Sequence, residues 1–278
     1  MTAILEATKT GTSGYAPVNG FDLYYEVHGT GEPLVVVPGG LMTIAMMGEI
    51  VPVLAASRQV VAIEPQAHGH TADVDRPLSY EQMADDVAAL IAYLGLERAD
   101  VFGFSVGGGV ALQTAIRHPA AVRKLVVVSG TFRGDGEYPE MRALTASFHA
   151  EMPILAGIRD GYLRAAPRPE GWPALVEKMR QLLTEEYDWS REVAAIRAPV
   201  LIVVGDADTL PPSHAVELFA LLGGGTAASA MGRLANAQLA VLPGTTHFGI
   251  MGRTDLLPAI VAPFLDAPLP DAEFAGVG

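Results

Sequence analysis

The amino-acid sequence predicts an α/β fold: a doubly wound, mostly parallel sheet with a helical cap inserted in it. Three observations support this fold class in a chain of 278 residues. Short apolar runs without polar interruption recur along the chain, which is typical of parallel strands buried on both faces. Longer amphipathic stretches lie between these runs, so strands alternate with helices and right-handed crossovers connect them. One long stretch has helical patterns but no strand pattern.

The predicted strands are short. An alternating stretch, Phe21–Val27, ends at the turn-forming residues Gly29–Pro33 and predicts an antiparallel hairpin at the edge of the sheet. The remaining strands are predicted to be parallel and central. They are Leu34–Val37, Val60–Ile63, Val101–Phe104, Leu125–Val128, Val200–Val204 and Leu239–Leu242.

The predicted helices lie between these strands. Ser79 and Gln82 form a capping box at the start of the first, and apolar residues follow at helical spacing as far as Leu94. The other core helices are predicted at Gly107–Arg117, Ser213–Leu222 and Asp255–Leu265.

The stretch from Thr131 to Arg197 contains only amphipathic patterns, such as Tyr138–Glu151 and Trp172–Tyr187. We therefore expect a core formed by residues 1–130 and 198–278, with residues 131–197 as a helical cap. The Gly-, Ala- and Ser-rich stretch Gly223–Ala237 predicts a flexible surface connection, and Ala267–Gly278 a loose tail.

The composition limits the partners of this chain. It has 18 Lys and Arg against 31 Asp and Glu, a net charge of −13, and half of its residues are hydrophobic. An acidic protein repels nucleic acid and anionic lipid, so a small molecule is the expected partner, and monomer and homodimer are both compatible. The chain has no cysteine, which excludes disulfides and thiolate chemistry. Without a signal-like or membrane-spanning stretch, we expect a cytoplasmic location.

The strongest functional motif is Gly103-Phe104-Ser105-Val106-Gly107. It follows an apolar strand and opens a helix, the context in which Gly-x-Ser-x-Gly forms a sharp turn that exposes the serine hydroxyl. The helix N-terminus behind the turn favours negative charge. Ser105 is therefore the predicted nucleophile.

A serine nucleophile needs a base and an acid that orients the base. The chain supplies both after its last two strands, in the order serine, acid, histidine. His247 is the only one of seven histidines in the third position. Asp208 is the predicted acid because it lies past the glycine turn, whereas Asp206 is better explained as a turn residue that binds backbone N–H groups.

A metal site is the weaker interpretation of the pair His68-Gly69-His70, because no further ligand of suitable spacing follows it. The oxyanion hole requires two backbone donors. Val106, directly after the nucleophile, is the first. The second is predicted in the loop after Leu34–Val37, with Gly40 favoured over Leu41.

By these residues the chain resembles the α/β-hydrolase superfamily over positions 20–266, and in particular its lidded serine-hydrolase branch, which contains carboxylesterases, perhydrolases, lactonases and carbon–carbon bond hydrolases. Two departures concern the loops. Pro38 stands where the family's oxyanion loop has histidine, and Glu64 begins a segment in which aspartate is usual. Serine at position 105 disfavours the dehalogenases and epoxide hydrolases of the superfamily, which use aspartate there.

The resemblance implies a cofactor-free serine esterase acting on small to medium apolar esters, with lactones included. Perhydrolysis of the haloperoxidase type and carbon–carbon bond cleavage are alternatives that use the same triad. A receptor-like binding protein with little catalysis is an alternative of another class. Apolar residues near the site are predicted to contact the substrate, although packing of the cap explains them as well. They are Met42, Phe104, Phe148, Met152, Trp172 and Phe248.

Overall fold

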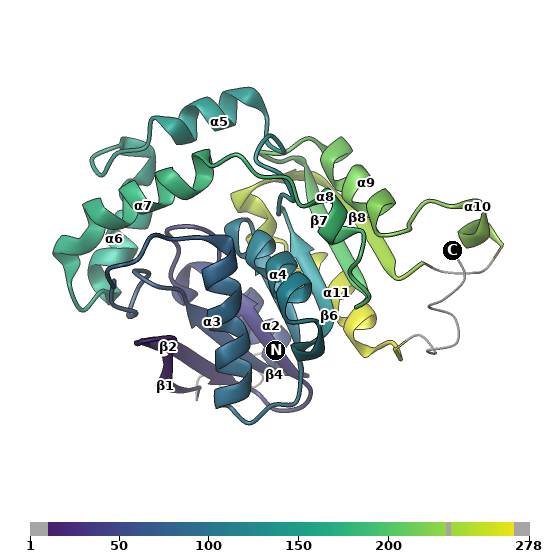
Figure 1. The fold of residues 1–278 in the computed structure, drawn as a ribbon, viewed down its shortest axis with the longest axis horizontal. Coiled ribbons are helices and arrows are strands. Elements are labelled where there is room, and N and C mark those ends of the chain that lie inside the picture. The colour runs from purple at the N-terminus through teal and green to yellow at the C-terminus, as the bar shows by residue number, and fades with distance from the viewer. Residues whose placement is uncertain (1–10, 232–234, 270–278) are drawn as a thin grey trace.

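The computed structural model describes residues 11–231 and 235–269, and it forms an α/β sandwich around one eight-stranded sheet (Figure 1). The strand order is β1-β2-β4-β3-β5-β6-β7-β8, and from β4 to β8 all neighbours are parallel. The predicted mostly parallel sheet is therefore confirmed. Its strands are β1 (Thr12–Val18), β2 (Phe21–His28), β3 (Pro33–Val37), β4 (Gln59–Glu64), β5 (Ala99–Phe104), β6 (Val122–Val128), β7 (Val200–Ala207) and β8 (Ala237–Thr246).

The N-terminal hairpin differs from the prediction. Its turn is Asn19-Gly20, both with positive φ (45° and 92°), and it joins β2 to the unpredicted strand β1. The segment Gly29–Pro33 makes no hairpin, because β2 pairs antiparallel with β4 and not with β3. Pro17 interrupts the strand pattern of β1 in the sequence, and the edge of the sheet is where a strand tolerates proline.

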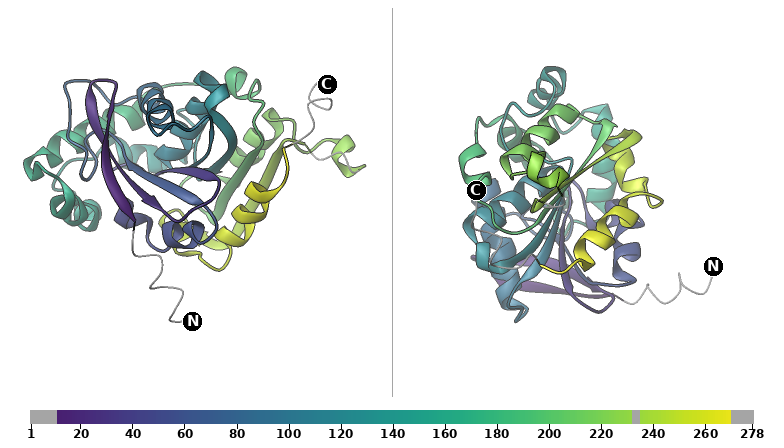
Figure 2. Two further views of the ribbon diagram at one scale, coloured as in Figure 1. Left: turned by 90° about the horizontal axis from the view of Figure 1, so that it is seen from below. Right: turned by 90° about the vertical axis from the view of Figure 1, so that its right-hand side faces the viewer.

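Two helical layers cover the sheet (Figure 2). Apolar side chains on one face pack against four helices and those on the other face against two, so the central strands are buried from both sides. The first group is α3 (Tyr80–Tyr93), α4 (Val106–Arg117), α8 (Ser190–Val193) and α9 (Pro212–Leu221). The second group is α2 (Ile50–Ala55) and α11 (Leu257–Asp266).

Half of the predicted capping box is present at the start of α3. The Ser79 hydroxyl accepts a hydrogen bond of 3.1 Å from the Gln82 N–H. The Gln82 Oε1 atom is buried and has no partner in the described part of the chain. The helix therefore starts where the sequence predicts, with one of the two reciprocal bonds.

Between β6 and α8 the chain forms three α-helices that lie over one end of the sheet (Figure 1). They are α5 (Pro139–Ala146), α6 (Ala156–Ala165) and α7 (Trp172–Thr184). The predicted helix Tyr138–Glu151 is thus shorter, and α6 is additional. We refer to α5, α6 and α7 as the inserted helices. The connection predicted at Gly223–Ala237 contains the short helix α10 (Ala227–Ala230). Residues 232–234 of that connection and residues 270–278 of the predicted tail lie outside the described residues.

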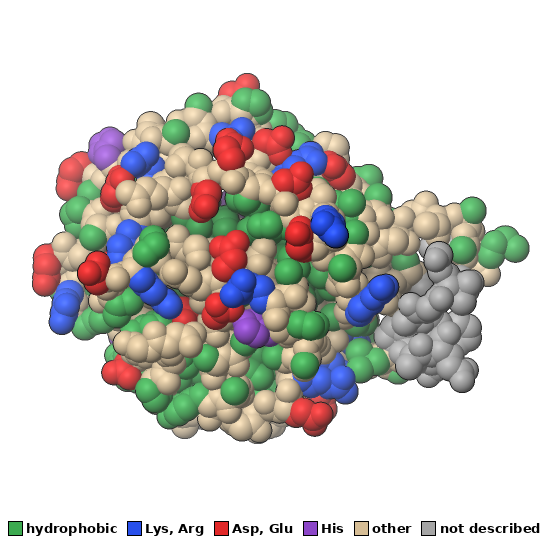
Figure 3. Space-filling model, viewed as in Figure 1, with side chains coloured by type: hydrophobic (Ala, Val, Ile, Leu, Met, Phe, Trp, Pro, Cys, Tyr) green, Lys and Arg blue, Asp and Glu red, His purple; other side chains and the backbone are tan. Residues whose placement is uncertain are grey.

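In the described ranges, no helix combines the length and the hydropathy that crossing a bilayer requires. Figure 3 shows acidic and basic side chains mixed over the inserted helices and the neighbouring surface, with apolar side chains between them. No single-sign field dominates that face.

A buried lysine fixes the last helix to the sheet, at the end opposite to the inserted helices. Lys124 on β6 is 1% exposed, and its ammonium donates to the carbonyls of Phe264 (2.8 Å) and Leu265 (3.0 Å) at the C-terminus of α11. A cation at this position binds orphan carbonyls and favours the helix dipole. Burial lowers the pKa of Lys124, so the contacts must offset the cost of removing its charge from water.

We expect Lys124→Met to lower the free energy of unfolding by about 2 kcal/mol, because the carbonyls of Phe264, Leu265 and Ala267 lose a charged donor. Urea denaturation followed by circular dichroism measures this change. The control is Arg98→Met, which removes an exposed cation and should leave stability within about 0.5 kcal/mol of the parent. Equal stability of the two variants would show that Lys124 does not anchor α11.

Candidate active site

Ser105 occupies a strained turn between β5 and α4. Its φ and ψ are 55° and −118°, a conformation that L-residues rarely adopt, and α4 begins at the next residue. The Ser105 N–H donates to the Val128 carbonyl at the end of β6 (2.8 Å), which fixes the turn to the neighbouring strand. The hydroxyl is thereby held above the carboxyl end of the sheet.

The two glycines of the motif are required by close backbone contacts. A Cβ atom at Gly103 would lie 1.9 Å from the Gly107 carbonyl oxygen, and one at Gly107 would lie 2.2 Å from the Val37 carbonyl oxygen. Neither obstacle is a flexible side chain that could move away. The turn can therefore form only with glycine on both sides of the serine.

His247 and Asp208 complete a hydrogen-bonded series with Ser105. His247 Nε2 lies 3.0 Å from Ser105 Oγ, and His247 Nδ1 lies 2.5 Å from Asp208 Oδ1. The three residues follow the ends of β5, β7 and β8, so the sheet brings together groups that are up to 142 positions apart. With Nδ1–H donating to the carboxylate, Nε2 is free to accept the serine proton.

Asp208 has more partners than the histidine alone. Its Oδ2 atom accepts from the Ser129 hydroxyl (2.6 Å) and the Gly205 N–H (3.1 Å), and Oδ1 accepts from the Thr209 N–H (2.8 Å). Burial alone would raise the pKa of Asp208, but the hydrogen bond and charge of His247 and these donors hold it below its usual range. The carboxylate is therefore both ionised and fixed in orientation.

Asp206 lies apart from this series. It is exposed, and its Oδ1 atom accepts from the Thr245 N–H at 3.0 Å, a bond between the β7 and β8 ends. The position past the glycine turn is thus the one that reaches the histidine.

The loop after β3 contains the candidate oxyanion donors, and Gly40 adjoins Val106. A Cβ atom at Gly40 would lie 3.0 Å from Val106 Cγ2 and 2.8 Å from Met179 Sδ. The Leu41 N–H already donates to His68 Nε2 (3.0 Å), and the Met42 N–H donates to the Gly39 carbonyl (3.2 Å). Because the Leu41 N–H is already hydrogen-bonded to His68, the geometry favours the Gly40 N–H as the second donor.

Two residues, one at the end of β4 and one in the segment that follows it, form hydrogen bonds to this loop. His68 is fully buried, with Nε2 on Leu41 and Nδ1 2.9 Å from the Gln66 carbonyl; burial lowers its pKa to about 4. The neutral ring therefore donates to Gln66 and accepts from Leu41. Glu64 is also buried and accepts from the Ile44 N–H at 3.0 Å. This pair supports the loop in which Pro38 replaces the family's histidine.

His68 and His70 point to different partners. His70 Nδ1 lies 2.9 Å from the buried Glu64 carboxylate, while His68 faces the oxyanion loop. Over residues 11–231 and 235–269, no three His, Asp or Glu side chains are grouped so as to hold a metal ion. The two histidines serve loop structure in this geometry.

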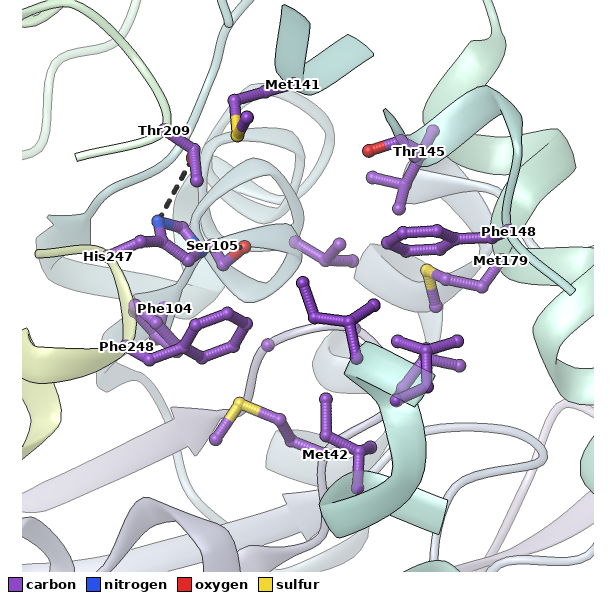
Figure 4. A pocket seen from close by; sticks show the side chains of 18 of the residues that line it. Met42, Phe104, Ser105, Met141, Thr145, Phe148, Met179, Thr209, His247 and Phe248 are labelled. Carbon is purple, nitrogen blue, oxygen red and sulfur yellow. Dashed lines mark hydrogen bonds between the residues drawn. The ribbon is translucent and has the colours of Figure 1, made fainter. Parts of the chain in front are cut away.

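A cavity of about 570 Å³ opens between Ser105 and the inserted helices. Phe148 and Met179 face Ser105 and His247 across it, and Met42 and Phe248 lie on the core side (Figure 4). The wall is mostly apolar, which suits a hydrophobic substrate. Of the residues predicted for the site, Met42, Phe104, Phe148 and Phe248 line this cavity, and so do Gly40, Leu41 and Val106.

Met152 and Trp172 do not line this cavity, contrary to the prediction. Trp172 is 3% exposed, and its Nε1–H donates to the Ala150 carbonyl (2.9 Å), so it joins the start of α7 to the chain ahead of α6. Met152 packs against the same apolar core. Both residues hold the inserted helices together. Composition alone does not tell an apolar residue that packs between helices from one that lines a pocket.

The sequence interpretation missed three polar residues of the site. Ser129 follows β6 and donates to Asp208; its place at a carboxyl strand end is a signal that could have identified it. Thr209 adjoins Asp208, and its Oγ1 atom lies 3.2 Å from His247 Nδ1. Glu137 also lines the cavity, but it sits in an irregular loop with no pattern to mark it.

Comparison with known proteins supports the fold class. Residues 32–171 match the family model described as alpha/beta hydrolase fold. The chain is 30% identical, over 74% of its length and 84% of the relative, to the protein named "Putative carbamate hydrolase RutD" of Azorhizobium caulinodans. It is 24% identical to a non-heme haloperoxidase of Rhodococcus erythropolis, over 90% of this chain and 97% of the relative. The crystal structure of a meta-cleavage product hydrolase from Pseudomonas fluorescens IP01 matches with a TM-score of 0.69 at 22% identity, covering 92% and 97%.

The buried His68 makes stability depend on pH. Its pKa is about 4 in the folded state against 6.5 in the unfolded chain, so between these values only the unfolded chain binds the proton. The free energy of unfolding should therefore fall as the pH falls from 6.5 to 4, by about 3 kcal/mol from this residue. Urea denaturation at pH 7.0 and 4.5 measures the change.

His68→Gln should make the same pH change less destabilising, because glutamine can accept from Leu41 without titrating. His149→Gln, which alters an exposed histidine, should keep the full pH dependence. A pH dependence that is unaltered in His68→Gln would contradict the assignment.

Proposed function

Because the chain belongs to the alpha/beta-hydrolase fold family and is a hydrolase, we propose that it cleaves carboxylic esters through an acyl-enzyme on Ser105. The observation that carries the proposal is the series Ser105–His247–Asp208, with successive distances of 3.0 and 2.5 Å, beside an apolar cavity. A nucleophile, a base and an orienting acid within hydrogen-bond reach are the parts that acyl transfer needs.

In the first half of the reaction, Ser105 Oγ attacks the ester carbonyl carbon while His247 Nε2 takes the hydroxyl proton. Asp208 stabilises the imidazolium that forms. The carbonyl oxygen gains negative charge, and the N–H groups of Val106 and Gly40 bind it at the N-terminus of α4. The intermediate then expels the alcohol, which receives its proton from His247.

In the second half, a water molecule gives a proton to His247 and attacks the acyl carbon. The acid leaves, and the proton returns to Ser105 Oγ. No cofactor enters either half. The strained backbone of Ser105 supports this cycle, since the hydroxyl is already placed for attack before substrate binds.

The substrate class follows from the cavity wall. Met42, Phe148, Met179 and Phe248 present apolar and adaptable surface, so small to medium apolar acyl or alcohol groups fit best. In this proposal residues 131–197 act as a cap that supplies one side of the pocket, as Phe148 and Met179 indicate. Lactones belong to the same class, because ring opening uses the same acyl transfer.

A carbamate is the second candidate substrate, favoured by the relative from Azorhizobium caulinodans. Its carbonyl would be attacked by the same serine. Perhydrolysis, in which hydrogen peroxide replaces water, and cleavage of a diketone carbon–carbon bond would also use this triad. Only the acceptor or the leaving group differs, so a substrate panel separates these reactions.

We expect Asp208→Asn to lower kcat on p-nitrophenyl butanoate by about 10⁴-fold, because the amide cannot hold His247 in the required tautomer. Ser105→Ala should abolish turnover and labelling by a fluorophosphonate probe. Asp206→Asn is the matched control and should keep activity, since its carboxylate binds only backbone N–H groups outside the triad. Loss of activity in Asp206→Asn with retention in Asp208→Asn would reverse the assignment of the acid.

The panel consists of p-nitrophenyl esters from acetate to decanoate, an N-alkyl carbamate phenyl ester, a β-diketone, and butanoate with hydrogen peroxide. We expect kcat/KM to be highest for medium-length esters, because the cavity of about 570 Å³ accommodates them with little empty space. Faster Ser105-dependent cleavage of the carbamate or the diketone would replace the ester proposal by that reaction. A protein that neither reacts with fluorophosphonate nor hydrolyses any panel member would be the receptor-like alternative.

A further inference from the structure

Glu137 is the one carboxylate among the described residues that line the cavity. The other polar side chains in that wall are Ser105, His247, Thr145 and Thr209. The mechanism of ester cleavage assigns Glu137 no step. A carboxylate in a wall that is otherwise mostly apolar therefore needs an explanation of its own.

One hydrogen bond ties Glu137 to the active site. The Thr209 hydroxyl donates to Glu137 Oε1 at 3.2 Å, and the Thr209 Oγ1 atom also lies 3.2 Å from His247 Nδ1. Thr209 thus bridges the carboxylate and the triad. The structure gives Glu137 no ion pair within the described residues, and Oε2 has no protein partner there.

Placing an ionised carboxylate at position 137 costs free energy. Burial raises the pKa of Glu137, and the negative Asp208 acts in the same direction, while the Thr209 bond and the charges of His247 and Arg142 act against it. The carboxylate is half-buried and has one neutral hydrogen-bond donor and no ion pair in the described part of the chain, so its charge is only partly compensated. A positively charged group in the cavity would supply the missing compensation.

Glu137 lies close to the nucleophile. It lines, together with Ser105, a second pocket of about 20 Å³ that opens beside the main cavity and includes Ser129 and Thr131. A pocket of this volume holds about one water molecule or one amino group. Because Ser105 and Glu137 line this same small pocket, a group bound there lies beside the serine.

We propose that Glu137 is a substrate-binding residue that selects esters with an amino group near the scissile carbonyl. The ammonium group would donate to the free Glu137 oxygen, and the apolar wall would hold the rest of the substrate. The inference rests on the proposed ester cleavage. The net charge of −13 also favours the approach of small cations.

The test compares matched ester pairs in which ammonium replaces methyl. In the acyl part, the p-nitrophenyl esters of glycine, 3-aminopropanoate and 4-aminobutanoate are paired with propanoate, butanoate and pentanoate. In the alcohol part, 2-aminoethyl butanoate is paired with propyl butanoate. The measured quantity is the kcat/KM of the amino ester divided by that of its neutral partner, at pH 7.

We expect this ratio to fall about tenfold or more in Glu137→Gln for at least one pair, the size of a charge-assisted hydrogen bond. Dividing by the kcat/KM of the neutral ester cancels any general loss of activity in the variant. Comparing the ratio of the variant with that of the parent cancels the different chemical reactivity of the two esters. Glu140→Gln is the control, because it removes the same charge from an exposed position on α5. It should leave every ratio as in the parent.

Two results would overturn the inference: ratios that are equal in the parent and Glu137→Gln for all pairs, or ratios that fall equally in Glu140→Gln. Binding gives a reading that needs no turnover. Ser105→Ala should bind the p-nitroanilide of the preferred amino acid at least tenfold more tightly than its neutral partner by calorimetry, and Glu137→Gln should remove the difference. If no neutral ester is hydrolysed, the proposed reaction fails, while the calorimetry still decides the role of Glu137.

Discussion

The contact between Gly103 and Gly107 is the constraint on which the active site depends. Their backbones approach so closely that a Cβ atom on Gly103 would meet the Gly107 carbonyl oxygen at 1.9 Å. This approach forces the strand to turn directly into α4 and leaves Ser105 with a positive φ. The serine hydroxyl and the N-terminus of α4 consequently face the same space. The proposed nucleophile and one of the proposed oxyanion donors are two results of one turn.

Lateral hydrogen bonds extend this arrangement along the edge of the sheet. The Ser105 N–H binds the end of β6, and the Ser129 N–H binds the Val203 carbonyl of β7. Ser129 then donates from its side chain to Asp208, which orients His247. Each strand end is thereby positioned by its neighbour. The sheet is continuous beneath Ser105, His247 and Asp208, and the inserted helices add the apolar wall.

The sequence was sufficient to predict the central strands and to single out Ser105, Asp208 and His247, which the structure places within hydrogen-bond distance of one another, because both depend on local chemistry. Buried strands need unbroken apolar runs, and the serine turn needs glycines at fixed spacing. The strand β1 was not predictable in this way, since Pro17 interrupts its pattern and only pairing with β2 defines it. Trp172 and Met152 were misplaced because an apolar residue in a helix can face a cavity or a neighbouring helix. Glu137 lies in an irregular loop, and the conformation of such a loop cannot be predicted from hydrophobic periodicity.

The prolines of the two outer strands have a consequence for how copies of this chain meet. β1 and β8 form the open edges of the sheet, and they contain Pro17 and Pro243. Proline offers no N–H group to a strand that would add to an edge, so it discourages sheet extension between molecules and the aggregation that follows from it. Each edge strand therefore has one position at which an added strand would find no donor, and this makes growth of the sheet between molecules less favourable.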